Sequence, residues 1–395
     1  MFLLQLLGLV GIALMLATLP LVVELLSLTV AALLPAPKLP EEEPGSPSPP
    51  IAVLIPAHNE ESLIGRCVRS VHASAGAGVE ILVVAHNCSD STASEAEAAG
   101  ARVLVLNDAS QRGKGCALSY GFGVALAGPA QGILIVDADS IVDPGLIAAV
   151  RQGFLRGARA LQCRYEVNNS QDSSRTKLMT LAFYAFNVIR PRGRSRLGLS
   201  AGILGNGFAL HRDVLTQIRY GAHSVVEDLE YHLALVRAGI RVEFIDAAAV
   251  RGEMPVAAKS AQTQRARWEG GRMLMMRQWA PGLMADVCRG RLRLIEPLFD
   301  LLALPIAMEV TLLLIAACLP VTWLRLYVLG AFSVLFLHVM SAAILGSGFW
   351  KAMEAMSSVP GYILWKLWIL PEIWRTSRAN AAWVRTKRES PADGR

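Results

Sequence analysis

The most constraining stretch of the sequence is Ile133–Ser140, in which four apolar residues lead directly into two carboxylates one residue apart, Asp137 and Asp139. An unbroken apolar run is typical of a strand that is buried on both faces, as in a parallel sheet. The carboxylates would then lie at the carboxyl end of that strand, where open α/β sheets bind ligands. Two carboxylates there suit a hard divalent cation that also binds substrate phosphates. The alternative is an Asp-capped turn, after which Asp143 and Pro144 begin the next helix.

Composition points to a membrane protein. Of the 395 residues, 53% are hydrophobic, and the mean hydropathy is +0.41. The net charge is +6, but the sequence has no Lys/Arg-rich block with interleaved aromatics, so we expect no nucleic-acid partner. Anionic lipid head groups suit this charge better. The six cysteines are scattered without a CxxC pair, which predicts reduced structural thiols and no zinc site.

Apolar and polar segments alternate in a way that predicts five regions. Phe2–Leu34 contains Glu24 as its only charge and is long enough to span a membrane. A signal peptide cleaved near Ala36 is the alternative. The predicted regions are a transmembrane helix (1–34), a Pro/Glu/Ser-rich linker (35–50), an α/β domain (51–290), two transmembrane helices (291–350) and amphipathic interfacial helices with a basic tail (351–395).

Residues 51–290 alternate apolar runs with helical patterns and show no internal repeat. Such βαβα alternation predicts a mostly parallel, Rossmann-like sheet covered by helices on both faces. The predicted strands are Ile51–Ile55, Val79–Val84, Arg102–Leu106 and Ile133–Val136, and the predicted helices are Glu60–Ala73, Ser91–Ala99 and Lys114–Leu126.

Two later apolar runs, Leu301–Pro320 and Leu326–Leu345, are each long enough to span a membrane. Asp300 and Glu309 are unusual at such places, and we expect them to face protein instead of lipid. The segment Pro360–Arg388 mixes four tryptophans with Lys and Arg, which favours helices in the membrane interface over an ordinary surface helix. The basic tail predicts that it and the α/β domain both lie in the cytoplasm.

Polar residues that could bind a nucleotide follow the first two predicted strands and precede the third predicted helix. Backbone N–H groups and polar side chains at strand-to-helix turns can hold nucleotides, and glycines with a lysine at a helix start suit phosphate. The simpler alternative for Asn59 is a helix N-cap. The candidates are Pro56, His58, Asn59, Glu60, Asn87, Asp90 and Lys114.

Three later motifs could complete a catalytic site. Gly205-Asn206-Gly207 predicts a tight turn before an apolar strand. Glu227 and Asp228 open a helix, where they either complement the helix dipole or supply a general base. Gln264, Arg267 and Trp268 share one helix face, and arginine and tryptophan suit phosphate and a sugar ring respectively.

The order of these motifs resembles the membrane-bound branch of the family 2 glycosyltransferases, which have the GT-A fold and include cellulose and hyaluronan synthases and ceramide glucosyltransferase. The resemblance rests on Pro56–Glu60, Asp137-Ala138-Asp139, Glu227-Asp228 and Gln264-Arg265-Ala266-Arg267-Trp268, and the Trp383–Arg388 segment is also similar. Two features differ from that branch: His86 stands where relatives usually have an Asp near the nucleotide base, and the chain has fewer predicted spans than polysaccharide synthases.

The resemblance implies an inverting, metal-dependent glycosyltransferase that uses a nucleotide sugar, a UDP-sugar above all, and Mg²⁺ or Mn²⁺ held by Asp139 and Asp137. It implies that Asp228 is the base and that Arg265 and Arg267 bind the diphosphate. Acceptor contacts would come from Gly205, Asn206, Gly207, Glu227, Gln264 and Trp268.

The expected acceptor is a membrane lipid or lipid-linked saccharide, at a bacterial inner membrane. The alternative is a processive polysaccharide synthase that works as a homo-oligomer or with an export partner. Two other classes stay open, a sugar nucleotidyltransferase and an inactive membrane scaffold. A nucleotidyltransferase would need neither the QxxRW motif nor the membrane segments.

Overall fold

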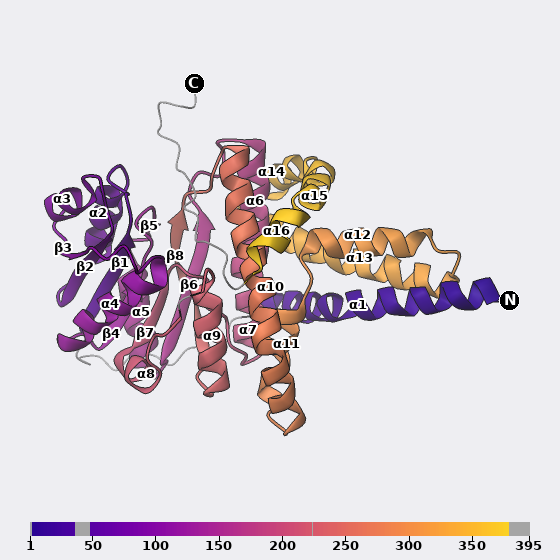
Figure 1. Ribbon diagram of the computed structural model, residues 1–395, viewed down its shortest axis with the longest axis horizontal. Helices are drawn as coiled ribbons and strands as arrows, with labels where there is room; N and C mark the ends of the chain where they lie inside the picture. Colours follow the sequence, from indigo (N-terminus) through magenta and orange to yellow (C-terminus); the bar gives the residue numbers. More distant parts are fainter. Residues whose placement is uncertain (1, 36–47, 223, 379–395) are drawn as a thin grey trace. The chain divides into compact units, whose positions relative to one another are not determined.

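The computed structural model describes residues 2–35, 48–222 and 224–378, which form two compact units (Figure 1). The sheet unit comprises the described parts of Pro35–Ser170 and Gly198–Ala257. The helical unit comprises those of Met1–Leu34, Gln171–Leu197 and Ala258–Ala381. The expected single domain over 51–290 is therefore divided, because residues 171–197 and the helix from Ala258 onward pack within the helical unit.

The sheet unit is built on one eight-stranded sheet in the order β3-β2-β1-β4-β7-β6-β8-β5. β7 and β5 run against the other six strands, so the sheet is mostly parallel, as predicted. The strands are β1 (Ile51–Ala57), β2 (Val79–His86), β3 (Arg102–Leu106), β4 (Gly132–Ile135), β5 (Ile141–Val142), β6 (Ala160–Val167), β7 (Phe208–His211) and β8 (Val242–Gly252).

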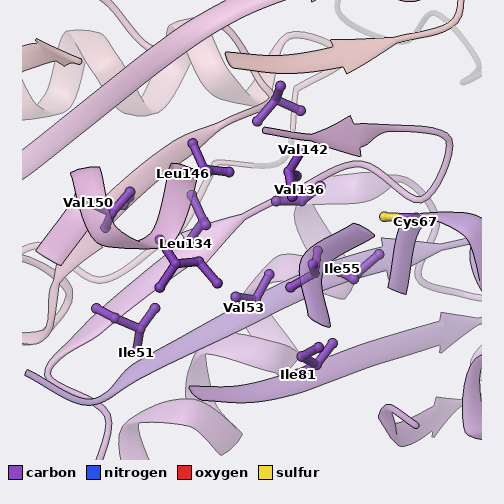
Figure 2. Packing of buried hydrophobic residues seen from close by; sticks show 14 of the residues in the cluster. Ile51, Val53, Ile55, Cys67, Ile81, Leu134, Val136, Val142, Leu146 and Val150 are labelled. Carbon is purple, nitrogen blue, oxygen red and sulfur yellow. The ribbon is translucent and has the colours of Figure 1, made fainter. Parts of the chain in front are cut away.

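Helices cover both faces of this sheet because the central strands are apolar on both sides. One core joins Val53 and Ile55 of β1 to α2, α3 and α5, and Figure 2 shows the side chains of β1 and β4 within it. The other core joins Leu54 of β1 to α4, α8 and α9. The helices are α2 (Ile64–Ser74), α3 (Thr92–Ala98), α4 (Lys114–Ala127), α5 (Leu146–Leu155), α8 (Arg212–Gln217) and α9 (Glu227–Arg237).

The predicted strands and helices of residues 51–136 are present, with shifted ends. The largest shift is at α2, which begins at Ile64 and not at Glu60. A turn precedes the helix, in which the N–H groups of Leu63 and Ile64 donate to Glu60 O at 3.0 and 2.9 Å. The alternative role of Asn59 as a helix N-cap is therefore wrong, because Leu63 holds that position.

The helical unit contains two helices long and apolar enough to cross a membrane, over Gln5–Leu33 and Thr322–Gly346. The run predicted as a span over Leu301–Pro320 contains the helix Ile306–Cys318, which forms a pair with Leu292–Leu302 that is bent by 79°. Pro305 lies at the break, where it cannot donate a backbone hydrogen bond. The bent pair counts as a third span only if both halves cross together.

The described helices of this unit include these apolar segments. They are α1 (Phe2–Leu33), α6 (Ser174–Tyr184), α7 (Arg190–Arg196), α10 (Ala258–Cys288), α11 (Ile295–Leu302), α12 (Ile306–Cys318), α13 (Thr322–Ala342), α14 (Phe349–Met356), α15 (Val359–Trp368) and α16 (Leu370–Thr376), with π turns at Ala185–Ile189 and Ala343–Ser347 and a 3₁₀ turn at Leu292–Leu294.

The short helices α14–α16 expose large apolar side chains, among them Trp350, Trp368 and Trp374. Exposed tryptophans are typical of helices in a membrane interface, as the sequence predicts. The predicted basic segment with Trp383 and its neighbours lies outside the described residues.

A buried ionic cluster ties the N-terminal helix to the rest of the helical unit. Glu24 of α1 contacts Arg190 and Arg194 of α7 at 2.5 and 2.9 Å. Arg194 also pairs with Glu296 and Asp300 of α11, at 2.5 and 2.9 Å. The prediction that Asp300 faces protein is thus confirmed, and Glu309 is likewise buried. Because an unpaired buried charge is costly, the loss of any one of these residues should destabilise the folded protein.

We expect Arg194→Met to lower the free energy of unfolding by roughly 3–5 kcal/mol, because it leaves Glu296 without its arginine partner and three largely buried carboxylates with only Arg190 and Arg272 to balance them. The measurement is thermal or denaturant unfolding of the purified protein in detergent. Arg289→Met is the matched control, since the Arg289 side chain is 75% exposed and lies 3.8 Å from Asp286. Equal stability of both variants would contradict a stabilising role for the cluster.

Candidate active site

The two carboxylates lie at the carboxyl end of β4, on a tight turn that we call the acid loop, residues 136–140. β4 lies between β1 and β7, the point at which the sheet changes from parallel to antiparallel pairing. Val136 continues the strand direction by donating its N–H to Leu54 O at 3.1 Å. The Ser140 N–H then closes the turn on Asp137 O at 3.0 Å. The side chains of Asp137 and Asp139 therefore leave the sheet edge close together.

Lys114, the first residue of α4, binds the acid loop directly. Its Nζ donates to the Asp137 carboxylate and to the carbonyl oxygen of Gly205, the latter at 2.5 Å. Burial alone would lower the pKa of Lys114, but Asp137 and Glu227 outweigh burial and raise it. Lys114 therefore stays protonated at neutral pH and counters part of the negative charge of the site.

Asp228 lies in the first turn of α9, close enough to Lys114 and Asp137 for their charges to act on it. Burial raises the pKa of Asp228, while the Leu229 N–H at 2.8 Å and the charge of Lys114 oppose that rise. A carboxylate with a raised pKa binds a proton more readily than an exposed aspartate does, which suits a general base. Glu227 is the neighbouring residue on the helix and also acts on the charge of Lys114.

Gly205 makes room for Asp228. It has a positive φ of 79°, and a Cβ atom at this position would lie 2.9 Å from Asp228 Oδ2. The tight turn predicted at Gly205–Gly207 is confirmed, and it leads directly into β7. The glycines thus permit the positive φ angles of the turn, and Gly205 also leaves room for the Asp228 carboxylate.

We expect Gly205→Ala to reduce transfer activity by about tenfold or more, since a 1 Å misplacement of a catalytic group can cost about 100-fold. The cause is the contact of the added methyl group with the Asp228 carboxylate, together with backbone strain at positive φ. Initial rates and thermal unfolding should be measured together. Gly239→Ala is the control, because φ there is also positive, 80°, with open space around the Cβ position. Equal activity losses in both variants would show that backbone strain alone is responsible.

The candidate nucleotide residues at the ends of β1 and β2 bind one another. His58 Nδ1 donates to His86 O at 2.7 Å, and Asn59 Oδ1 accepts from Ser89 N at 2.7 Å. The Glu60 N–H donates to Thr92 Oγ1 at 2.7 Å, and Pro56 continues β1. These bonds bring His58, Asn59 and Glu60 to the ends of β2 and α3, at the same sheet edge as the acid loop.

Asn87 and Asp90 have local structural roles in this arrangement. Asn87 has a φ of 52°, and its amide donates to Asp108 O and Gln111 O at 2.9 and 3.0 Å. Asp90 accepts from both the N–H and the hydroxyl of Thr92, which hold its pKa below the usual range although burial opposes this. Burial lowers the pKa of His86, so its imidazole is neutral at pH 7.

The predicted motif Gln264–Trp268 lies on α10 of the helical unit. Arg265 lies 5.5 Å from the Trp268 ring and contacts Met179 Sδ at 2.6 Å. Trp268 also packs against Phe183, with 6.0 Å between ring centroids. The roles of Gln264, Arg265, Arg267 and Trp268 toward donor and acceptor stay predictions, because these residues belong to the other unit.

The side chains of Ser140 in the acid loop, Gln162 of β6 and Asn206 make hydrogen bonds that the sequence did not predict. All three side chains are fully buried. Both ends of the Asn206 amide are bound within the protein. The predicted approach of the Gly205–Gly207 backbone to an acceptor stays a prediction. The available signal was a polar residue, Gln162, between the apolar Leu161 and Cys163 of β6.

The donor set suits a hard divalent cation that is only partly coordinated by protein. Among the described residues, no group of three or more His, Cys, Asp or Glu side chains is placed to hold a metal. Two carboxylates on one short loop match Mg²⁺ or Mn²⁺ sites, in which water and substrate phosphate oxygens supply the remaining ligands. The geometry therefore fits a cation that arrives with a phosphorylated substrate.

Comparison with known proteins gives a consistent picture. Residues 49–271 match the family model "Glycosyltransferase like family 2". A probable glycosyltransferase of Bacillus subtilis, YdaM, is 26% identical over 234 residues, which are 56% of this chain and 55% of the relative, so the match spans about half the length of YdaM.

Solved structures share the fold. The mannosyltransferase PcManGT from Pyrobaculum calidifontis, in complex with GDP-mannose and Mn²⁺, covers 91% of this chain and 99% of its own, with a TM-score of 0.58 at 17% identity. Glucosyl-3-phosphoglycerate synthase from Mycobacterium tuberculosis, with Mn²⁺, UDP and product, covers 59% and 86%, with a TM-score of 0.39 at 20% identity. The first of these likenesses supports a GT-A-like fold.

Proposed function

Because the chain belongs to the family 2 glycosyltransferases, we propose that it transfers a sugar from a nucleotide sugar to an acceptor hydroxyl, with inversion at the anomeric carbon. The observation that carries this proposal is the convergence of Asp137, Lys114 and Asp228 around the Gly205 turn at the carboxyl end of β4. Open α/β sheets bind ligands at such an edge. A cation site, a fixed positive charge and a carboxylate base are the groups that this reaction needs.

Asp228 is the proposed base. It would accept the proton of the acceptor hydroxyl as that oxygen attacks the anomeric carbon from the face opposite the leaving diphosphate. Burial keeps its proton affinity high, and the absence of a side chain at Gly205 leaves room for its carboxylate. Glu227, one position earlier on the helix, points about 100° away and would contact the acceptor instead.

The negative charge of the diphosphate would be balanced by Lys114 and by the cation held at Asp139 and Asp137. A bound Mg²⁺ or Mn²⁺ supplies Lewis-acid stabilisation of the leaving group. Lys114 already spans from Asp137 to the Gly205 carbonyl, so its charge lies between the acid loop and the acceptor side. His58, Asn59 and Glu60 would border the nucleoside of a UDP-sugar, the donor that the family resemblance favours.

The proposed acceptor is a membrane lipid or a lipid-linked saccharide. Support comes from the two helices that can span a membrane and from the exposed tryptophans of α14–α16. We place the sheet unit in the cytoplasm at a bacterial inner membrane, on the grounds of the basic C-terminal segment. The second candidate is a processive polysaccharide synthase acting as an oligomer or with an export partner. Such synthases have more spans than the two, or three with the bent pair, in the described part of this chain.

The test is a donor screen with detergent-solubilised protein, labelled UDP- and GDP-sugars, Mn²⁺ or Mg²⁺, and bacterial lipid extract. We expect one donor to be consumed and its label to enter the lipid fraction. Label in a water-soluble polymer would favour the synthase. Formation of a nucleotide sugar and pyrophosphate from a sugar 1-phosphate and a nucleoside triphosphate would favour a nucleotidyltransferase. No turnover of any donor would favour an inactive scaffold.

A further inference from the structure

A chain of fully buried polar side chains lies directly behind the carboxylates of the acid loop. Asn206, Ser140 and Gln162 have no exposed surface, and Asp139 is only 8% exposed. Burying polar groups costs free energy unless each forms hydrogen bonds, so such a chain persists only when it is well satisfied. Here the hydrogen bonds run from the sheet interior to the candidate metal ligands.

The direction of each hydrogen bond is fixed by its donors. The Asp137 N–H can only donate, so the atom of Asn206 that it contacts at 3.1 Å must be the amide oxygen. The Asn206 Nδ2 group therefore points at Ser140 Oγ, 2.8 Å away. Ser140 Oγ accepts this N–H, and its own hydroxyl proton is donated to Asp139 Oδ1 at 3.1 Å. A single amide thus holds the backbone of one carboxylate and, through a hydroxyl, the side chain of the other.

Gln162 of β6 fixes the turn that carries this amide. Its Nε2 donates to Asn206 O at 2.8 Å, and its Oε1 accepts from Leu204 N at 2.9 Å. These bonds hold the backbone on both sides of Gly205. The orientation of the Asn206 side chain is therefore set from the sheet.

We propose that Asn206 and Ser140 are positioning residues that orient Asp139 and thereby set the affinity of the acid loop for its divalent cation. This inference rests on the metal-dependent transfer proposed above. Hydrogen-bond partners behind metal ligands commonly change metal affinity by 10–100-fold when they are removed. Asn206 acts on both carboxylates, so its loss should cost more than that of Ser140.

The experiment measures Mn²⁺ binding to the full-length, detergent-solubilised protein with UDP present and acceptor absent, by electron paramagnetic resonance of free Mn²⁺. We expect Ser140→Ala and Asn206→Ala to weaken Mn²⁺ binding by about tenfold or more, with the larger loss in Asn206→Ala. The double variant should match Asn206→Ala, because both residues act through one chain of bonds. Ser140→Thr keeps the hydroxyl and should restore binding relative to Ser140→Ala.

Asn169→Ala is the matched control, because the Asn169 amide also bridges two backbone groups, Met254 N at 2.8 Å and Met254 O at 2.9 Å. It should keep the parent affinity for Mn²⁺. Parent-like Mn²⁺ binding in Ser140→Ala and in a folded Asn206→Ala would overturn the inference and leave the proposed function intact. A parent protein that binds no Mn²⁺ would overturn both the inference and the metal requirement. Ser140→Ala removes a single atom, so it keeps the test valid if Asn206→Ala does not fold.

Discussion

Asp228→Asn should slow sugar transfer by at least about 100-fold, the scale expected when a general base is removed. The substitution preserves the size of the side chain, and the asparagine oxygen can still accept the Leu229 N–H at the helix start. It removes only the ability to take a proton. Donor affinity should therefore survive, and the measurement is transfer rate alongside UDP-sugar binding.

Glu227→Gln is the comparison variant, and it should cost less. The two residues are adjacent on α9, but Gly205 is shaped around Asp228. A further readout is the pH profile. Because burial raises the pKa of Asp228, parent activity should fall as pH drops through that raised value, and this acid limb should vanish in Asp228→Asn. A near-parent rate in Asp228→Asn with an inactive Glu227→Gln would reverse the assignment. If both variants lose donor binding, these two carboxylates serve the metal site or the fold, and another residue is the base.

The sequence predicts the strands β1–β4 with small shifts at their ends, because those features are local. Each apolar run of β1, β2 and β4 is short, unbroken and followed closely by polar residues. The apolar pattern and the polar residues after it therefore indicate the same strand ends. The placement of Asp137 and Asp139 follows from that alone, since the side chains after a parallel strand emerge at one edge of the sheet. Lys114 could be assigned to the same edge because it begins the helix after β3.

The parts that could not be predicted depend on contacts between distant residues. The hydrogen bonds of the Asn206 side chain to Asp137 N and Ser140 Oγ could not be predicted, because these partners lie 69 and 66 positions away in the sequence. The partners of Glu24 lie 166 and 170 positions away, so its lone charge in an apolar helix gave no hint of them. The bend at Pro305 was hidden because hydropathy counts residues and ignores a missing backbone donor.

Chelation of divalent cations should abolish transfer, and Mn²⁺ or Mg²⁺ should restore it. The reason is charge balance at the acid loop. Asp137, Asp139 and Asp228 are countered there by Lys114, and a nucleotide sugar brings a further diphosphate. Two like charges 4 Å apart repel by about 4 kcal/mol at an effective dielectric constant of 20, so a single lysine cannot offset this excess.

The measurement is the initial transfer rate in excess chelator and after titration with each cation. Asp139→Asn serves as the companion variant, because it leaves the contact of Lys114 with Asp137 in place while removing one proposed ligand. In that variant, far more Mn²⁺ should be needed for any recovery. Monovalent salt should not replace the divalent ion, since screening acts weakly on partly buried charges. Full activity in excess chelator would mean that Lys114 and the protein's backbone donors neutralise the diphosphate by themselves, and that the acid loop serves the fold or the acceptor instead.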